Sequence, residues 1–196
     1  MKILITAFEP FGDSDINSAC LAMNLLPENH SNQVIIKKIL PVVYGESIDK
    51  LKDLIDEVSP DAVICLGQSA RDSNLRIERI AVNLDDAENE DNEGIIHIDV
   101  PISEDGPAAY FTTLPTRAML DECNKKGIPA HISYTAGNYV CNHVMYGLMN
   151  YIKGKDIIGG FIHIPLAPAQ AAGKANLPSM NSSDAATGIL AMLSVL

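Results

Sequence analysis

Basic residues are scarce in this chain of 196 residues. Its 14 lysines and arginines are outnumbered by 25 aspartates and glutamates, which gives a formal net charge of −11 at pH 7. Because nucleic acids and anionic lipid surfaces repel such a charge, we expect neither of them as a partner.

Long apolar runs are also lacking. The most apolar region, residues 157–173, is interrupted by a histidine, two prolines and a glutamine, so it does not predict a membrane-spanning helix. The apolar start, residues 1–8, is too short for the core of a signal peptide and has no small-residue cleavage site. We therefore expect a cytoplasmic protein. The length, without a repeat or a linker, predicts a single domain over residues 1–196.

No two of the four cysteines form a Cys-x-x-Cys pair, which argues against a structural zinc site and a redox motif. Cys65 lies in an apolar run and Cys123 in a helical pattern, so both are expected to be ordinary buried or half-buried thiols. A metal site made by Cys141, His143 and His163 is disfavoured, because residues two apart on a helix point in different directions. We therefore expect no metal site.

Apolar strand-like runs alternate with helical patterns along the chain. Strands are expected over residues 3–8, 34–40, 62–67, 75–82, 131–134 and 157–164, and helices over 48–58 and 118–123, with a last helix capped by residues 181–184. This alternation predicts an α/β domain with a largely parallel sheet covered on both faces. Residues 85–106 are rich in acidic residues, asparagine and glycine, and are expected to form a long surface loop.

One cysteine stands at the head of a helical pattern. Apolar residues follow Cys141 at offsets of three, four, seven and eight, which is typical of a buried helix face. The positive end of the helix dipole favours a thiolate, the nucleophilic form of cysteine. The turn over residues 135–137 would offer free backbone N–H groups to an oxyanion. A buried structural cysteine is the alternative, and these neighbours favour the nucleophile.

Two further ionisable residues lie in apolar segments. His163 is expected near the carboxyl end of a strand, where the sites of open α/β sheets gather. It is either a satisfied core histidine or, together with Cys141, a general base. Glu78 needs a partner inside its apolar strand. The sequence leaves open whether that partner is a neighbouring arginine or the histidine.

Two of only four phenylalanines, Phe8 and Phe11, flank a turn just beyond the first expected strand. Such a turn either closes over the core or forms a flat apolar slot for a small planar ring. The residues around this turn leave both interpretations open.

A series of short motifs follows in one order along the chain. They are Phe8-Glu-Pro-Phe-Gly12 with Asn17, Gly67-Gln68, Glu78-Arg79 with Asn83, Asp91-Asn-Glu-Gly94, Gly106-Pro-Ala-Ala-Tyr110, Ser133-Tyr-Thr-Ala-Gly137, Val140-Cys-Asn-His143 and Gly160-Phe-Ile-His-Ile-Pro165. Together they resemble pyroglutamyl-peptidase type I, a cysteine peptidase family also called pyrrolidone-carboxylate peptidase. The resemblance extends to about residue 168, and the stretch beyond it resembles nothing diagnostic.

The resemblance implies an exopeptidase that removes N-terminal pyroglutamate from peptides. It also implies a three-layer αβα sandwich of the phosphorylase/hydrolase-like type, no cofactor and commonly a homotetramer. By the same resemblance Cys141 is the nucleophile, His163 the general base and then acid, and Glu78 the group that orients the imidazole. The implied ring pocket consists of Phe8, Phe11, Asn17, Gln68, Val140 and Tyr139, the last being more usually phenylalanine in the family.

One position departs from the family pattern. Glu88 stands where the family usually has an arginine, and an anion close to the cysteine would disfavour the thiolate. Three explanations are open: an arginine such as Arg71, Arg76 or Arg79 compensates, the loop points away from the site, or activity is reduced.

Two other functions compete with the peptidase. A catalytically idle binder of small molecules on the same fold is favoured only by Glu88, and the intact Cys141, His163 and Glu78 count against it. A nucleoside phosphorylase-like enzyme would need a phosphate cradle, but the sequence contains neither a glycine-rich phosphate loop nor a basic cluster.

Overall fold

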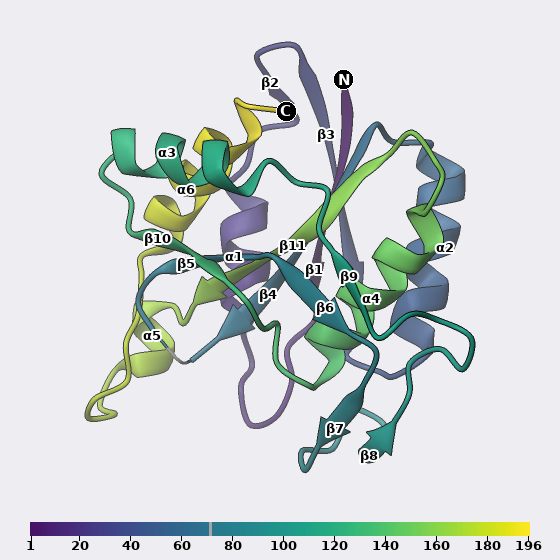
Figure 1. Ribbon diagram of the computed structural model, residues 1–196. Helices are drawn as coiled ribbons and strands as arrows, with labels where there is room; N and C mark the ends of the chain where they lie inside the picture. Colours follow the sequence, from purple (N-terminus) through teal and green to yellow (C-terminus); the bar gives the residue numbers. More distant parts are fainter. Residues whose placement is uncertain (71) are drawn as a thin grey trace.

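The computed structural model describes residues 1–70 and 72–196 (Figure 1). Arg71, one of the residues considered as compensating for Glu88, lies outside the described residues. In the described part of the chain, seven strands form a central sheet in the order β10-β5-β11-β4-β1-β3-β2. In that order the strands are Ala130–Ser133, Leu75–Glu78, Ile158–Pro165, Ala62–Ser69, Lys2–Phe8, Gln33–Leu40 and Asn29–His30.

The central strands of this sheet run parallel to one another. Parallel pairing joins β11 to β4, β4 to β1, β1 to β3 and β10 to β5, whereas β5 is antiparallel to β11 and the short β2 is antiparallel to β3. The expectation of a mostly parallel sheet is therefore confirmed.

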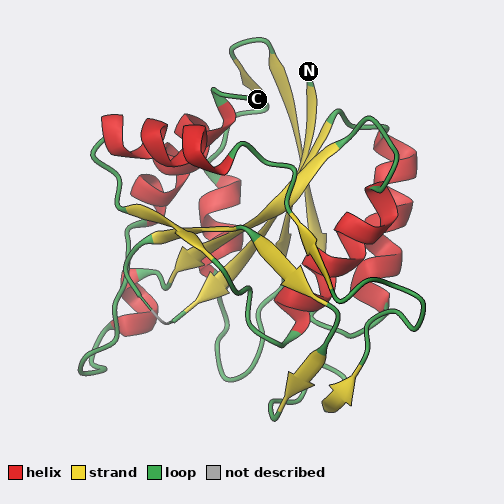
Figure 2. Ribbon diagram, viewed as in Figure 1, coloured by secondary structure: helices red, strands yellow, loops and turns green. Residues whose placement is uncertain are grey.

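Helices cover both faces of the sheet, as Figure 2 shows in red on either side of the yellow strands. Helices α1 (Ser18–Asn24), α3 (Thr116–Lys125) and α6 (Ser182–Leu193) pack on one face, and α2 (Glu46–Val58) and α4 (Val140–Ile152) on the other. Neighbouring strand residues alternate between the two cores: Ile3 and Ile5 contribute to the first, and Leu4 to the second. The result is the expected three-layer αβα architecture.

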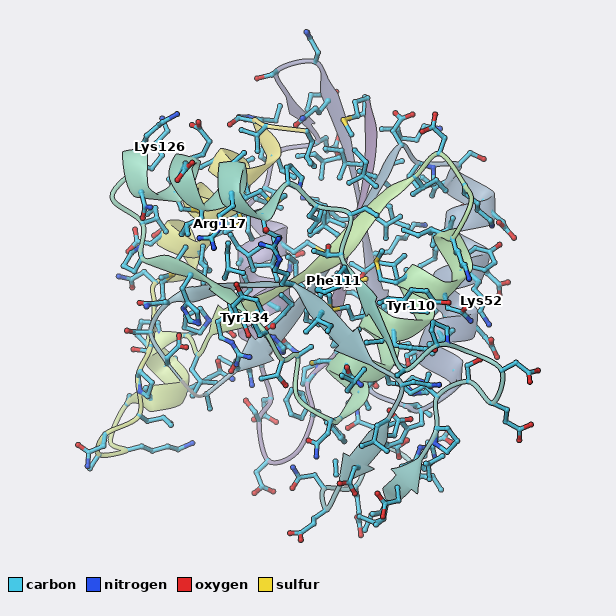
Figure 3. The ribbon with its side chains drawn as sticks, in the orientation of Figure 1. Lys52, Tyr110, Phe111, Arg117, Lys126 and Tyr134 are labelled. Carbon is cyan, nitrogen blue, oxygen red and sulfur yellow. The ribbon has the colours of Figure 1, made fainter. Side chains whose placement is uncertain are left out.

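One expected strand is divided in the structure. Residues 75–82 form β5 and then β6 (Ile80–Val82), with a break at Arg79. The reason is that the two halves have different partners: β5 lies in the central sheet, whereas β6 leaves it and pairs with β9 (Ala109–Phe111). Phe111, at the end of β9, is exposed, as is Tyr134 just after β10 (Figure 3).

The expectation of a long loop over residues 85–106 is partly wrong. This stretch contains β7 (Asp85–Ala87) and β8 (His97–Val100), which pair antiparallel and lie at the bottom of the view in Figure 1. The sequence pattern missed them because these short strands depend on backbone pairing and polar contacts instead of alternating apolar burial.

The helices differ from expectation in two places. Helix α1 was not expected; it is short, and the side chain of Asn17 caps it by accepting a hydrogen bond from the backbone N–H of Ala19 at 3.0 Å. Asn181 occupies the N-cap position of α6, but its side chain makes no capping hydrogen bond with the described residues. A short α5 (Pro168–Ala171) follows β11. Among the described residues, no helix is both long and apolar enough to cross a membrane.

Candidate active site

A cavity of about 770 Å³ opens where the carboxyl ends of the central strands meet the N-terminus of α4. Phe8 is the last residue of β1, Gln68 is the second-to-last residue of β4, and Val140 is the first residue of α4. This end of a parallel sheet is where α/β folds commonly place their binding sites.

The cavity brings together nearly all the site residues expected from the sequence. Those that line it are Cys141, His163, Phe8, Phe11, Asn17, Gln68, Tyr139 and Val140. Glu78 does not line it and lies behind His163, fully buried. Other lining residues that the motifs had not singled out as site residues include Val42, Ser69, Asp86, Asn89, Ile98 and Asn138.

Glu78 contacts both of the partners that the sequence left open. Its Oε1 lies 2.8 Å from His163 Nδ1 and 3.0 Å from Arg76 Nη2. Because an ionised carboxylate only accepts hydrogen bonds, it holds the proton on Nδ1 and leaves the lone pair of Nε2 available as a base. The antiparallel pairing of β5 with β11 creates this contact. It sets Glu78 opposite Phe161 and Arg76 opposite His163, which places the four side chains on one face of the sheet.

Arg76 is held on several sides. Nη1 donates to Ser69 Oγ at 3.1 Å, and Nη2 donates to Ser133 Oγ at 3.1 Å and to the Thr135 carbonyl at 2.6 Å. The guanidinium therefore links three strands of the sheet to the turn that precedes α4. Its ion pair is with Glu78, so its charge is compensated within the protein.

Glu88 lines the cavity, which excludes the explanation that its loop points away. Arg76 pairs with Glu78, and Arg79 donates to Thr116 Oγ1 at 3.4 Å. Within residues 1–70 and 72–196, neither arginine forms a salt bridge with Glu88. Neither arginine therefore pairs directly with Glu88, although Arg76 still lowers the pKa of the Cys141 thiol.

Cys141 is the second residue of α4, and its side chain is half-buried. Burial raises the pKa of the thiol to about 12; the Glu78 carboxylate acts in the same direction and Arg76 opposes it. The helix position alone had favoured a thiolate. Burial acts in the opposite direction and favours the protonated thiol. A base must therefore take the thiol proton during any reaction.

Gly67 on β4 makes room for the sulfur. It pairs in register with His163 on the parallel neighbour β11, so a Cβ at Gly67 would project to the same face as the imidazole. That Cβ would lie 2.6 Å from Phe161 Cζ, closer than side chains tolerate, and 3.0 Å from Cys141 Sγ, so the sulfur would have to shift. The sulfur therefore sits directly over Gly67, on the sheet face that carries His163.

Aromatic rings form the apolar side of the site. Phe8 is buried and its ring centroid lies 6.3 Å from that of Phe161, which in turn lies 4.9 Å from the His163 ring. Phe11 is half-buried, with its centroid 6.4 Å from that of Tyr139. Phe161 does not line the cavity, but its ring packs against those of Phe8 and His163, two residues that do.

Two amide side chains of the site are fixed by hydrogen bonds. Gln68 Oε1 accepts the Ser18 backbone N–H and Gln170 Nε2, each at 2.8 Å. Asn17 Nδ2 donates to the Glu9 carbonyl at 3.1 Å. The hydrogen bonds between described residues use the oxygen of Gln68 and leave its Nε2 hydrogens for a ligand.

Cys65 and Cys123 are buried, as expected, Cys20 is half-buried, and all four thiols are free. His143 does not share the site of Cys141: its Nδ1 lies 2.7 Å from Asp85 Oδ2, and its Nε2 accepts the Gly45 backbone N–H at 2.9 Å. Among the described residues, no group of three or more histidine, cysteine, aspartate or glutamate residues could hold a metal ion.

Fold and site together define a class of protein. A cysteine at a helix start, a histidine in the same cavity and a buried carboxylate bonded to that histidine form the constellation of cysteine hydrolases.

Comparison with known proteins narrows this class. The family model described as pyroglutamyl peptidase matches residues 1–196. The pyrrolidone-carboxylate peptidase of Clostridium perfringens (strain 13 / Type A) is 48% identical over 191 residues, covering 96% of this chain and 90% of that relative. The peptidase of the same name from Bacillus cytotoxicus is 45% identical over 196 residues, covering 98% of this chain and 91% of the relative.

Solved structures agree. The pyroglutamyl peptidase I of Bacillus amyloliquefaciens superposes with a TM-score of 0.93 at 38% identity, covering 97% of this chain and 94% of that one. The pyrrolidone carboxyl peptidase of Thermococcus litoralis gives a TM-score of 0.94 at 39% identity, covering 99% and 92%. The chain belongs to the pyroglutamyl peptidase family and is a peptidase of that family.

Proposed function

We propose that the protein is a cysteine exopeptidase that removes N-terminal pyroglutamate from peptides. The observation that carries the proposal is the hydrogen bond between His163 Nδ1 and Glu78 Oε1, which leaves Nε2 free in the cavity that contains Cys141. The names of the relatives, pyrrolidone-carboxylate peptidase and pyroglutamyl peptidase, support this substrate class.

The cavity chemistry suits a pyroglutamyl group. This group is a five-membered lactam with neither a free amine nor a free carboxylate, so apolar faces and hydrogen bonds must hold it. In the proposal Phe8 and Phe11 enclose the ring, with Tyr139 and Val140 at its edge. Gln68 Nε2 donates to the lactam carbonyl, and Asn17 holds the adjoining turn. Proline, which lacks that carbonyl, is rejected because the amide would then be left unpaired.

The reaction follows from the three proposed catalytic residues. His163 Nε2 takes the thiol proton while Cys141 Sγ bonds to the acyl carbon, and backbone N–H groups at the start of α4 stabilise the oxyanion. The imidazolium then gives its proton to the leaving nitrogen, the C–N bond breaks, and the shortened peptide departs from a thioester. Glu78 keeps the imidazole in the required tautomer and stabilises its charge.

Hydrolysis of the thioester repeats the proton transfers in reverse. His163 removes a proton from water, whose oxygen attacks the acyl carbon. The C–S bond breaks, the proton returns to Cys141 Sγ, and free pyroglutamate leaves. The cycle needs no cofactor.

The broader properties are proposals of the same kind. We treat residues 1–196 as one catalytic domain, supported by the match of the family model over this range. A cytoplasmic location would keep the Cys141 thiol reduced. A homotetramer is supported by exposed apolar side chains that an interface would cover, among them Phe111, Tyr134, Ile95 and Ile96.

Release of a fluorophore from a pyroglutamyl amide tests the proposal, with the prolyl amide as control. Turnover of the pyroglutamyl amide alone, abolished in Cys141→Ser, is the expected result. An idle binder on the same fold is the alternative that this assay excludes. It would bind pyroglutamate in calorimetry without turning over the amide.

A further inference from the structure

The cavity is much larger than the lactam ring that the proposed function assigns to it. Its volume of about 770 Å³ leaves room for the residue that follows pyroglutamate in a peptide. The lining divides into two parts. Aromatic and amide side chains lie near Cys141, and the polypeptide segment of residues 86–89 forms a second wall.

This second wall is attached to the residues that lead into the nucleophile helix. The Asp86 N–H donates to the Asn138 carbonyl at 3.0 Å, and Asn138 Nδ2 donates back to the Asp86 carbonyl. Tyr139 Oη donates to the Glu90 carbonyl at 2.8 Å. Glu88 therefore lies midway along a segment held at both ends by the two residues just before Val140.

A buried pair fixes the start of the same segment. Asp85 Oδ2 lies 2.7 Å from His143 Nδ1 on α4, and the Gly45 N–H donates to His143 Nε2 at 2.9 Å. The wall is thus tied to α4 at His143 as well as at the two residues before the helix.

The charge of the described cavity lining is unbalanced toward the anionic side. Its charged residues are Arg76, Asp86 and Glu88. Arg76 is paired with Glu78 and bonded to two serine hydroxyls, so its charge is compensated inside the protein. Asp86 Oδ1 accepts only a backbone N–H, that of Asp99 at 3.3 Å, and Glu88 is exposed with no salt bridge to a described residue. Within residues 1–70 and 72–196, the acidic wall therefore lines the cavity without a cationic partner of its own.

We infer that Glu88, assisted by Asp86, makes the enzyme select peptides in which a lysine or arginine follows pyroglutamate. The inference rests on the proposed function and assigns Glu88 a specificity role within the same cavity. A cationic side chain leaving the ring slot meets the acidic wall, whereas an acidic side chain is repelled by it. Glu88 takes no part in bond breaking.

Coulomb's law sets the size of the effect. Two opposite charges about 6 Å apart in a water-like medium change a binding constant by a factor of about three. A lysine peptide gains this factor and a glutamate peptide loses it, so the two differ by about tenfold. Because the wall is solvent-exposed, added salt reduces the difference.

The test compares three otherwise identical peptides with lysine, alanine or glutamate after pyroglutamate, and measures kcat/KM from released pyroglutamate. The expected order is lysine, alanine, glutamate, with about tenfold between the ends. Glu88→Gln is expected to reduce this ratio to about threefold or less, and Glu88→Arg to invert it. Using a ratio removes any general effect of the substitution on Cys141.

Glu57→Gln is the matched control. It removes one exposed carboxylate beside Asp56, which accepts a hydrogen bond from Tyr151 in the last turn of α4, at the end away from Cys141. The control is expected to keep the wild-type ratio. Equal kcat/KM for the lysine and glutamate peptides, or a preference that Glu88→Gln leaves unchanged, would overturn the inference.

A binding measurement separates this inference from the proposed function. Calorimetric titration of Cys141→Ser with the same peptides reads the charge ranking without turnover. Failure of the wild type to hydrolyse the alanine peptide counts against the peptidase. A flat ranking in the titration counts against Glu88 alone.

Discussion

The imidazole of His163 and the carboxylate of Glu78 meet through a 2.8 Å contact between Nδ1 and Oε1. Both residues are nearly or wholly buried, and Arg76 Nη2 reaches the same oxygen at 3.0 Å. One carboxylate oxygen thus neutralises an arginine and orients a histidine. Because β5 and β11 are adjacent strands, the backbone of the sheet maintains this geometry.

Replacement of this carboxylate is expected to affect catalysis and stability together. Glu78→Gln removes the charge that fixes the Nδ1 proton, so kcat should fall by about 10²-fold to 10⁴-fold. It also leaves the buried Arg76 without its counter-ion, which costs on the order of 3 kcal/mol of unfolding free energy. Turnover of the pyroglutamyl amide and urea unfolding measure the two effects. Full activity in a folded Glu78→Gln protein would contradict the assigned role.

Gly67 should tolerate no side chain. The Cβ of Gly67→Ala would press on Cys141 Sγ and on Phe161, and kcat should fall by about 10²-fold because a displaced nucleophile loses its orientation. The double variant Gly67→Ala/Phe161→Leu is the control. It removes the contact with the phenyl ring but keeps the one with the sulfur. Compared with Gly67→Ala, the double variant should therefore be less strained, while its kcat should stay low. Recovery of turnover would show that the sulfur position is not limiting.

The raised pKa of the Cys141 thiol predicts its reactivity. Iodoacetamide reacts with the thiolate, so alkylation of the free enzyme should accelerate about tenfold per pH unit and keep rising beyond pH 9. Peptide mass mapping and Cys141→Ser separate this reaction from the other thiols. A plateau below pH 8 would instead indicate a preformed thiolate.

The same shift has a consequence for stability. The ordinary thiol pKa of 9.0 is raised to about 12 in the folded protein, so the unfolded chain releases its proton first as the pH rises. The contribution of Cys141 to stability is therefore fully present below pH 9 and is lost progressively between pH 9 and 12. Urea unfolding of the wild type and Cys141→Ser over this range should show a smaller pH dependence in the variant.

The buried His143–Asp85 pair should stabilise the folded protein. His143→Leu leaves the Asp85 carboxylate buried with only the more distant His97 at 3.2 Å, and the unfolding free energy should fall by about 2 kcal/mol or more. His143→Asn, which can still donate to the carboxylate, should lose less. Equal urea midpoints for the wild type and His143→Leu would contradict this reading of the pair.

The core of the fold could be predicted because local apolar patterns in the sequence indicate its strands and helices. Strands β1, β4 and β11 are each mostly apolar and are buried on both faces over most of their length. The pair β7 and β8 gave no such signal, since both strands are short and contain few buried apolar residues. Their order depends on contacts such as that between Asp85 and His143.

The site shows the same division. The helix pattern after Cys141 and the strand position of His163 drew attention to these residues from the sequence. That Glu78 would serve both His163 and Arg76 could not be read locally, because it depends on β5 lying antiparallel to β11. The direction of the Cys141 pKa shift was also out of reach, since burial by distant segments and not the helix position decides it.

Trapping the acyl-enzyme tests the central claim most directly. Wild-type protein is mixed with a pyroglutamyl amide, quenched in acid within milliseconds, digested and examined by mass spectrometry. The account predicts a pyroglutamyl group on the peptide that contains Cys141, sensitive to hydroxylamine as a thioester is, and absent from Cys141→Ser. Turnover of the amide by Cys141→Ser, or an adduct on Cys20, Cys65 or Cys123 instead, would contradict the account.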